Sequence, residues 1–149
     1  MKNFKNYIIR VAFTYVILLP ISGCSLIENN NNENTRDLLR AWELATITDE
    51  TGNTIELFDG EVHTLRFSSE RTLGGETACN FYGGDFSAER DGNIRINNIL
   101  TTEIACEQPN HSPEYLSALG EADEFSVHSG RLVLRYGNAG ELIFEERLE

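Results

Sequence analysis

The chain has 149 residues, and its 24 acidic residues against 12 basic ones give a formal net charge of −12. Its only lysines are Lys2 and Lys5, so arginine carries the permanent positive charge of all later segments. Nucleic-acid binding needs clustered lysine and arginine, so this composition argues against a nucleic-acid partner.

Residues 1–23 have the pattern of a secretory signal peptide. Basic residues precede an apolar run from Val11 to Leu19, and small residues follow just before Cys24. The apolar run is shorter than the ~20 residues that a bilayer-spanning helix needs. The stretch "ISGC" resembles the bacterial lipobox, which implies that Cys24 is lipidated and becomes the first mature residue. The alternative is an ordinary signal peptide with an incidental cysteine.

The residues after Cys24 bear on localisation. In the lipoproteins that this start resembles, an aspartate after the cysteine typically retains the protein in the inner membrane, whereas this chain has Ser25. The resemblance therefore implies a lipid anchor in the outer membrane, on its periplasmic or surface face. Residues 24–35 are polar and rich in asparagine, which predicts a flexible tether to a domain at 36–149.

From Trp42 onward, short alternating apolar runs separated by turn signals predict a mainly β (α+β) domain. The first runs are 42–47, 54–58 and 62–68. In the third run, alternation places His63, Leu65 and Phe67 on one face. Residues 80–97 predict a hairpin that closes at Asp91-Gly92, and 124–148 predict three strands with turns at 129–130 and 137–140.

One segment, 112–124, predicts a helix. Ser112 suits the N-cap, Pro113 suits the first helical position, and Gly120 suits the end. Tyr115, Leu116 and Leu119 then share the face that covers the sheet. A second, shorter helix at "TRDLLRAW" is the alternative to an early start of the first strand.

The stretch "GGETACNFYGGDF" at 74–86 allows three interpretations: a phosphate-binding loop, a thiol nucleophile or a disulfide. A phosphate-binding loop needs a lysine after its glycines, and no lysine follows here. A thiol nucleophile needs a lowered pKa, whereas the nearby Glu76 and Asp85 would raise the pKa of Cys79. The approach of His63, His111 or His128 in the fold stays open as the alternative.

A disulfide explains the cysteines better. If Cys24 is lipidated, Cys79 and Cys106 remain as an even pair in an oxidising compartment. Two buried free thiols stay open as the alternative. Within the same stretch, Gly74-Gly75 predicts a turn, and Gly83-Gly84 predicts a strand bend or bulge.

Six segments occur in the order and spacing of the META/HslJ-like domain, and this resemblance covers almost all of 39–145. They are "LRAWELATI", "LRF", "GGETACNFYGGDF", "TTEIAC", "EYLSAL" and "RLVLRY…GELIF". The most specific part is a Cys-Asn-x-aromatic-x-Gly-x-aromatic signature, whose residues here are Cys79, Asn80, Tyr82, Gly84 and Phe86.

The chain departs from the family pattern at two positions. Ala78 stands where glycine is usual, and Ile104 stands where methionine is frequent. The resemblance implies a compact, partly open antiparallel β-barrel with one packed helix. It also implies an envelope lipoprotein linked to heat and drug stress, with no catalytic centre.

The family is similar in fold to lipoprotein pilotins that hold acyl chains, which implies a binding role. The expected partners are the membrane, through the lipid anchor, and an apolar ligand or an envelope protein. Trp42, Tyr82 and Phe86 are the candidate ligand-binding residues, with core packing as the alternative. The runner-up functions are a thiol or hydrolase enzyme and a purely structural envelope protein.

The three histidines do not predict a metal site. His63, His111 and His128 lack the close spacing of zinc ligands, so no metal or other cofactor is expected.

Overall fold

The computed structural model describes residues 35–148. The predicted signal peptide, the lipidation site Cys24 and nearly all of the predicted tether lie outside this range. Within it, no helix is both long enough and apolar enough to cross a bilayer.

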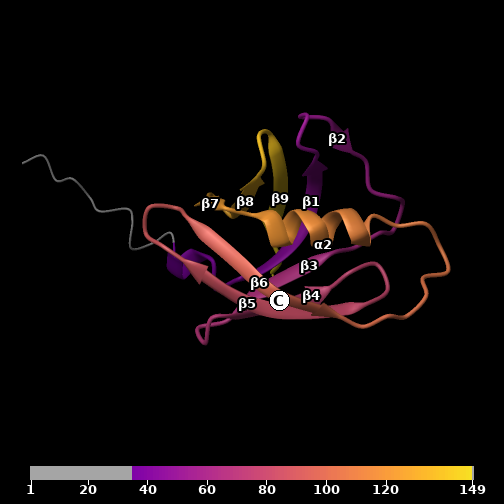
Figure 1. Ribbon diagram of the computed structural model, residues 1–149, viewed down its shortest axis with the longest axis horizontal. Coiled ribbons are helices and arrows are strands. Elements are labelled where there is room, and N and C mark those ends of the chain that lie inside the picture. The colour runs from indigo at the N-terminus through magenta and orange to yellow at the C-terminus, as the bar shows by residue number, and fades with distance from the viewer. Residues whose placement is uncertain (1–34, 149) are drawn as a thin grey trace, which may run out of the picture.

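The described residues form one antiparallel sheet of nine strands and a helix (Figure 1). The elements are β1 (Ala41–Thr48), β2 (Thr54–Ile55), β3 (Thr64–Phe67), β4 (Thr72–Glu76), β5 (Phe81–Ala88), β6 (Ile94–Thr101), α2 (Ser112–Glu121), β7 (Glu124–His128), β8 (Arg131–Tyr136) and β9 (Gly140–Glu146). The strand order is β6-β5-β4-β3-β1-β9-β8-β7, and β2 pairs with β1.

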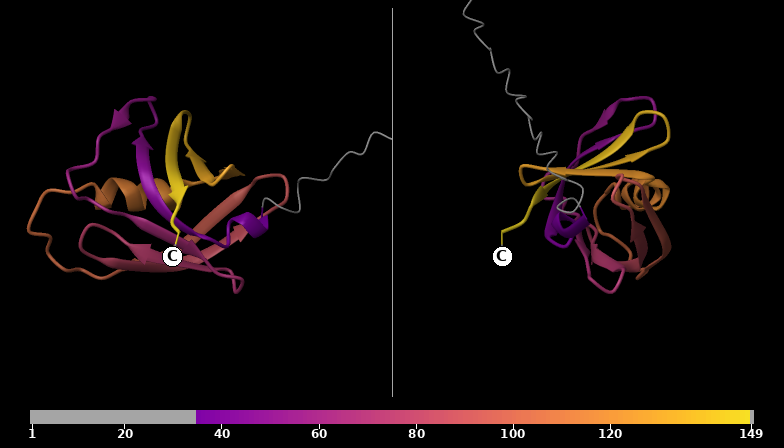
Figure 2. Two further views of the ribbon diagram at one scale, coloured as in Figure 1. Left: turned by 180° about the vertical axis from the view of Figure 1, so that it is seen from behind. Right: turned by 90° about the vertical axis from the view of Figure 1, so that its left-hand side faces the viewer.

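The sheet curls into a half-barrel, and α2 packs inside the curl (Figure 2). The end strands β6 and β7 meet only at one end, where Asn93 bridges to Glu124. There the Ile94 amide donates to Asp123 O, 2.9 Å away, and the Phe125 amide donates to Gly92 O at 2.7 Å. Elsewhere α2 fills the space between β6 and the β8–β9 pair. The expected fold, a partly open antiparallel barrel with one packed helix, is confirmed.

Alternation along the strands places the core where the sequence predicts it. In and next to β3, His63, Leu65 and Phe67 are at most 2% exposed, whereas Val62 and Arg66 face solvent. The two tight hairpins also form. Ser129 and Gly130 both have positive φ (51° and 76°), as a two-residue turn requires, and Gly92 has φ 95°.

The helix lies close to its predicted range, but its start differs in detail. Ser112 is the first residue of α2 rather than its N-cap, and its side chain is buried. His111 is the N-cap residue, and its side chain makes no capping hydrogen bond. The Ser112 amide instead donates to Asn110 Oδ1, 3.1 Å away. Tyr115 and Leu119 are fully buried, and Leu116 packs partly against the core.

The structure corrects two local predictions and decides between two alternatives at a third position. Gly74 and Gly75 are not a turn: they lie inside β4 and pair with Gly83 and Tyr82 of β5. The predicted strand at 54–58 is only two residues long. Of "TRDLLRAW", residues 35–37 are helical, and β1 begins at Ala41.

Candidate functional site

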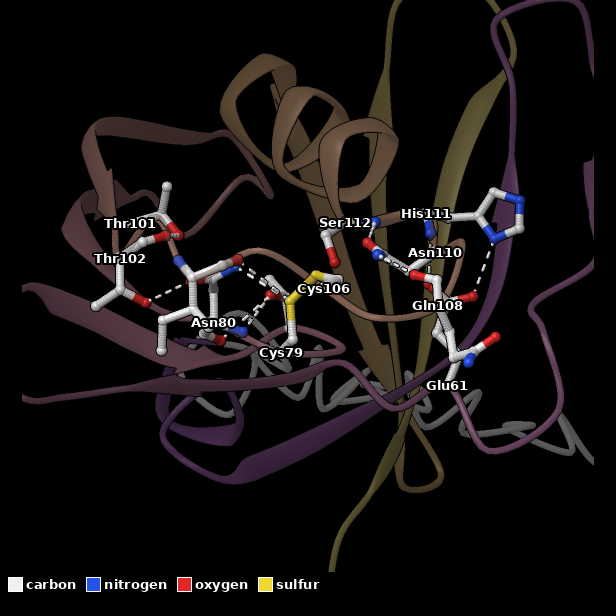
Figure 3. Close-up of a disulfide and its surroundings, with 12 residues drawn as sticks. Glu61, Cys79, Asn80, Thr101, Thr102, Cys106, Gln108, Asn110, His111 and Ser112 are labelled. Atoms are coloured by element: carbon white, nitrogen blue, oxygen red, sulfur yellow. Dashed lines mark hydrogen bonds and ion pairs between the residues drawn. A yellow bond between two sulfur atoms is a disulfide. The ribbon is translucent and has the colours of Figure 1, made fainter.

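A disulfide joins the loop before β5 to the segment after β6 (Figure 3). It links Cys79 to Cys106, whose Cα atoms are 5.7 Å apart and whose positions in the sequence are separated by 27. Both cysteines are half-buried. Because each cysteine lies just outside a paired strand, the disulfide closes the end of the β5–β6 hairpin.

Asn80, the second residue of the signature, holds the same segment through its side-chain amide. Its Oδ1 accepts from the Ile104 amide and from Thr102 Oγ1, both at 2.7 Å. Its Nδ2 donates to Ile104 O at 3.0 Å and contacts Cys79 Sγ at 3.3 Å. The side chain therefore pairs with Ile104 as a neighbouring strand would, which explains why an amide is needed beside this disulfide.

The signature glycine is required by a close approach between strands. At Gly84 the β5–β6 register shifts, which is the predicted bulge. A Cβ at Gly84 would lie 2.9 Å from Asn97 O, which is closer than Cβ atoms approach other heavy atoms in real proteins. In β4, a Cβ at Gly75 would overlap the carbonyl oxygen of Thr64 and lie 2.9 Å from Tyr82 Oη. Gly84 therefore lets β5 approach β6 closely, and Gly75 lets β4 approach β3 closely.

The three candidate ligand-binding aromatics pack into the core. Trp42 is fully buried and its Nε1 donates to Leu38 O at 3.0 Å, while Tyr82 is 6% exposed. Phe86 is half-buried and packs edge-on against Phe67, with ring centroids 4.7 Å apart. Strand alternation directs their side chains inward, and Trp42 and Tyr82 also belong to the lining of a groove described below. Core packing, the alternative that the sequence left open, is the arrangement observed.

Tyr82 forms a buried hydroxyl pair with Tyr115 of α2. Their Oη atoms are 2.6 Å apart, and Tyr82 Oη also donates to Thr64 O at 2.7 Å. Burial raises the pKa of Tyr82 and that of Tyr115 well above the ordinary tyrosine value. Both phenols stay neutral at physiological pH, so they act here as hydrogen-bonding groups that tie the helix to β3 and β5.

A second polar group, the Glu61 cluster of Glu61, His63 and His111, lies where α2 begins. Figure 3 shows two of its members, Glu61 and His111. Glu61 is 2% exposed at its side chain, and His63 is fully buried. Glu61 Oε1 accepts from the His111 amide at 2.5 Å and from His63 Nε2 at 2.8 Å. Its Oε2 accepts from His111 Nδ1 and from the Phe58 amide, both at 3.0 Å.

These contacts determine the charge state of the cluster. Burial by itself raises the pKa of Glu61, but hydrogen bonds from the His111 amide and ring, the Phe58 amide and His63 outweigh it and lower that pKa to about 2. Burial lowers the pKa of His63, although the neighbouring Glu61 opposes this. Around neutral pH the cluster is therefore an ionised carboxylate with a neutral His63.

A groove of about 760 Å³ is lined by residues of β1, β3, β4 and β5 and by residues 147–148, and the candidate residues Trp42 and Tyr82 are part of this lining. Backbone of Gly74 and Gly75 forms part of its lining, because neither residue has a side chain there. Phe81 and Leu148, which are 59% and 88% exposed, add apolar surface to the lining, and Arg147 adds positive charge. Phe81 precedes the buried Tyr82, so the aromatic that faces outward is one residue away from the one predicted.

The sequence matches the META domain over residues 36–149. The chain belongs to the META domain family.

Solved structures share the fold of this META domain. A protein from Burkholderia xenovorans solved by NMR is 24% identical, with a TM-score of 0.67 over 77% of this chain and 87% of that one. A crystal structure of a DUF4847 family protein from Bacteroides vulgatus is 15% identical, with a TM-score of 0.59 over 75% and 95%. At these identities the likeness shows the fold alone. Among curated proteins, none matches.

Sequence reasoning missed the Glu61 cluster of this META domain. Glu61 and His111 lie 50 positions apart, so only the docking of α2 beside the start of β3 brings them together. The third histidine, His128, lies exposed at the end of β7 and takes no part. Within residues 35–148, no group of three or more His, Cys, Asp or Glu side chains is arranged to hold a metal ion.

Proposed function

We propose that this META domain protein is a non-catalytic binding protein of the bacterial envelope that contributes to stress tolerance. The observation that carries the proposal is the groove over β1, β3, β4 and β5. Its volume of about 760 Å³ is that of a small-ligand site, and exposed Phe81 supplies an aromatic surface. Its occupant is an apolar ligand or an apolar segment of an envelope protein.

The Glu61 cluster supports binding rather than catalysis. Glu61 and His63 together resemble an acid–base pair, but their side chains are 2% and 0% exposed. A general base must reach the proton that it abstracts, directly or through one water. Groups buried under α2 and hydrogen-bonded to one another serve the packing of the helix instead.

The anchoring part of the proposal rests on the sequence before residue 35. The signal pattern and "ISGC" favour a lipidated Cys24, and Ser25 favours delivery to the outer membrane. Two or more acyl chains anchor a protein stably, whereas one chain binds only marginally. A polar tether would then hold the domain and its groove near the membrane surface.

The groove can be tested with a neutral apolar fluorophore, N-phenyl-1-naphthylamine, added to the purified lipoprotein in detergent-free nanodiscs. Thr72 is exposed and lines the groove, so Thr72→Trp should fill it and weaken dye binding about tenfold or more. Ser87→Trp places the same side chain on β5 outside the groove and should leave binding unchanged. Equal binding by all three proteins, or binding by none, would remove the support for this site.

The anchor can be tested by intact mass and fractionation. Cys24 should carry acyl chains at the mature N-terminus, and Cys24→Ser should leave the membrane fraction. Ser25→Asp should shift protein from the outer to the inner membrane. An uncleaved precursor with an unmodified Cys24 would contradict the proposal.

A further inference from the structure

We propose that Glu61, His63 and His111 form an acid-sensitive clasp, which fastens the start of α2 to β3 and opens when His63 takes up a proton. The inference concerns the interior of the domain, so it stands apart from the proposed groove. Figure 3 shows Glu61 and His111 facing one another below the first turn of the helix.

The clasp joins two elements through one carboxylate. Glu61 precedes β3 and accepts hydrogen bonds from both sides: from His63 Nε2 at 2.8 Å, and from the amide and ring of His111 at 2.5 and 3.0 Å. His111 is the residue immediately before α2. An anion at this end of a helix also interacts favourably with the helix dipole.

The protonation state of His63 follows from these bonds. Ionised Glu61 can only accept, so His63 Nε2 carries the hydrogen and neutral His63 leaves Nδ1 as an acceptor. Nδ1 is buried and has no hydrogen-bond partner among the described residues. A proton added there would create a buried N–H donor without an acceptor, which is unfavourable.

The same junction contains a second unsatisfied group. Among residues 35–148, the buried side-chain atoms without a partner are His63 Nδ1 and Ser112 Oγ, and Ser112 directly follows His111. Native proteins leave few buried polar atoms unpaired. Opening the junction would let water hydrogen-bond to both atoms. The start of the helix therefore separates from the sheet at this junction with the smallest free-energy cost.

The charged and titratable groups around His63 do not offset the destabilisation that protonation of His63 causes. Burial lowers the pKa of His63, and the charge of Glu61 opposes this only in part. His111 can donate Nδ1–H to Glu61 whether its ring is neutral or protonated. Tyr115, which lies 4.8 Å from His63 between ring centroids, and its partner Tyr82 keep their protons because burial raises the pKa of each. His63 is therefore the group that senses mild acid.

The disulfide limits how far the clasp can open. Cys106 stays linked to Cys79, so the part that can be released begins at residue 107 and extends into α2, within residues 107–119. In the open form His63 is hydrated, and its pKa returns to about 6.5. If the closed form stays unprotonated, one proton favours opening about 30-fold more at pH 5.0 than at pH 7.5.

Hydrogen exchange of the intact mature lipoprotein, corrected for intrinsic exchange at each pH, measures this opening. The opening constant of amides in 107–119 should rise about 30-fold from pH 7.5 to 5.0. Amides of β1 and β9 should stay protected, because they belong to the central strands of the sheet. An unchanged opening constant in 107–119, or an equal rise in β1 and β9, would overturn the clasp.

Two matched variants identify the sensor. His63→Phe keeps a ring beside Tyr115 but cannot titrate, so exchange in 107–119 should lose its pH dependence. His128→Phe makes the same change at an exposed position and should behave as wild type. Wild-type pH dependence in His63→Phe would overturn the proposal.

A third variant keeps the test decisive if His63→Phe does not fold. Glu61→Gln retains the size of the side chain and one acceptor oxygen but removes the charge that holds His63 and His111. It should raise the opening constant of 107–119 already at pH 7.5. An opening constant equal to that of the wild type at this pH would also overturn the clasp.

Discussion

Gly75 and Gly83 lie on neighbouring strands and differ in the space around them. A Cβ at Gly75 would overlap Thr64 O, whereas a Cβ at Gly83 would lie 3.5 Å from Leu73 O, an ordinary contact. We expect Gly75→Ala to lower the free energy of unfolding by about 1–3 kcal/mol or more, because the backbone of β3 must move. Gly83→Ala should change it by less than about 1 kcal/mol. Urea denaturation of both variants measures the difference, and equal costs would contradict this reading of Gly75.

Asn80 provides a second test at the scale of single residues. Its side chain makes two hydrogen bonds to Ile104 and one to Thr102. Asn80→Asp should lower the free energy of unfolding by about 1–3 kcal/mol, because a carboxylate cannot donate to Ile104 O and would repel it. Asn138→Asp, at an exposed turn, is the matched control. Thermal unfolding should show a clear loss for the first variant alone, and similar melting temperatures would count against the proposed role of Asn80.

At the scale of elements, the attachment of α2 depends on ionised Glu61. The pKa of Glu61 is about 2 in the folded protein, below its ordinary value of 4.5. The unfolded state therefore binds the proton more tightly, so the stabilisation is complete above about pH 4.5 and is lost as the pH falls toward about 2. At pH 7 it corresponds to about 3 kcal/mol as an order of magnitude.

Glu61→Gln should therefore be less stable than wild type by about 3 kcal/mol at pH 7, and the gap should shrink between about pH 4.5 and 2. Glu145→Gln is the control, because Glu145 is 65% exposed and 3.5 Å from Arg131, a surface pair of small effect. Urea denaturation at a series of pH values measures both. A gap that does not depend on pH would show that Glu61 acts through packing rather than charge.

At the scale of the whole molecule, the disulfide restrains a domain whose sheet does not close. Cys79 and Cys106 are 27 residues apart, and linking them should stabilise the domain by about 3 to 4 kcal/mol in the chain-entropy model. Reduction, or the double variant Cys79→Ser and Cys106→Ser, should lower the melting temperature in calorimetry. Two alkylatable thiols in the native, unreduced protein would contradict the bond itself.

Most of the architecture could be predicted from the sequence because strand and helix patterns are local. The alternation of His63, Leu65 and Phe67, the turn at Ser129-Gly130 and the face of Tyr115 and Leu119 each depend on residues a few positions apart. The same reasoning failed at Gly74-Gly75. Glycine pairs signal turns locally, but here a strand needs them because a neighbouring strand comes close.

The sequence by itself determined the secretory signal pattern, the likeness of "ISGC" to a lipobox and the mainly β character of the domain, because each is written in adjacent residues. Only the tertiary structure decided which aromatic faces outward and which groups hydrogen-bond to Glu61. Tyr82 turns inward and Phe81 outward according to the side of the sheet that α2 covers. Glu61, His63 and His111 meet because the helix docks beside β3. Burial there raises the pKa of Glu61, but the hydrogen bonds formed at the junction outweigh it and lower that pKa, whereas burial lowers the pKa of His63.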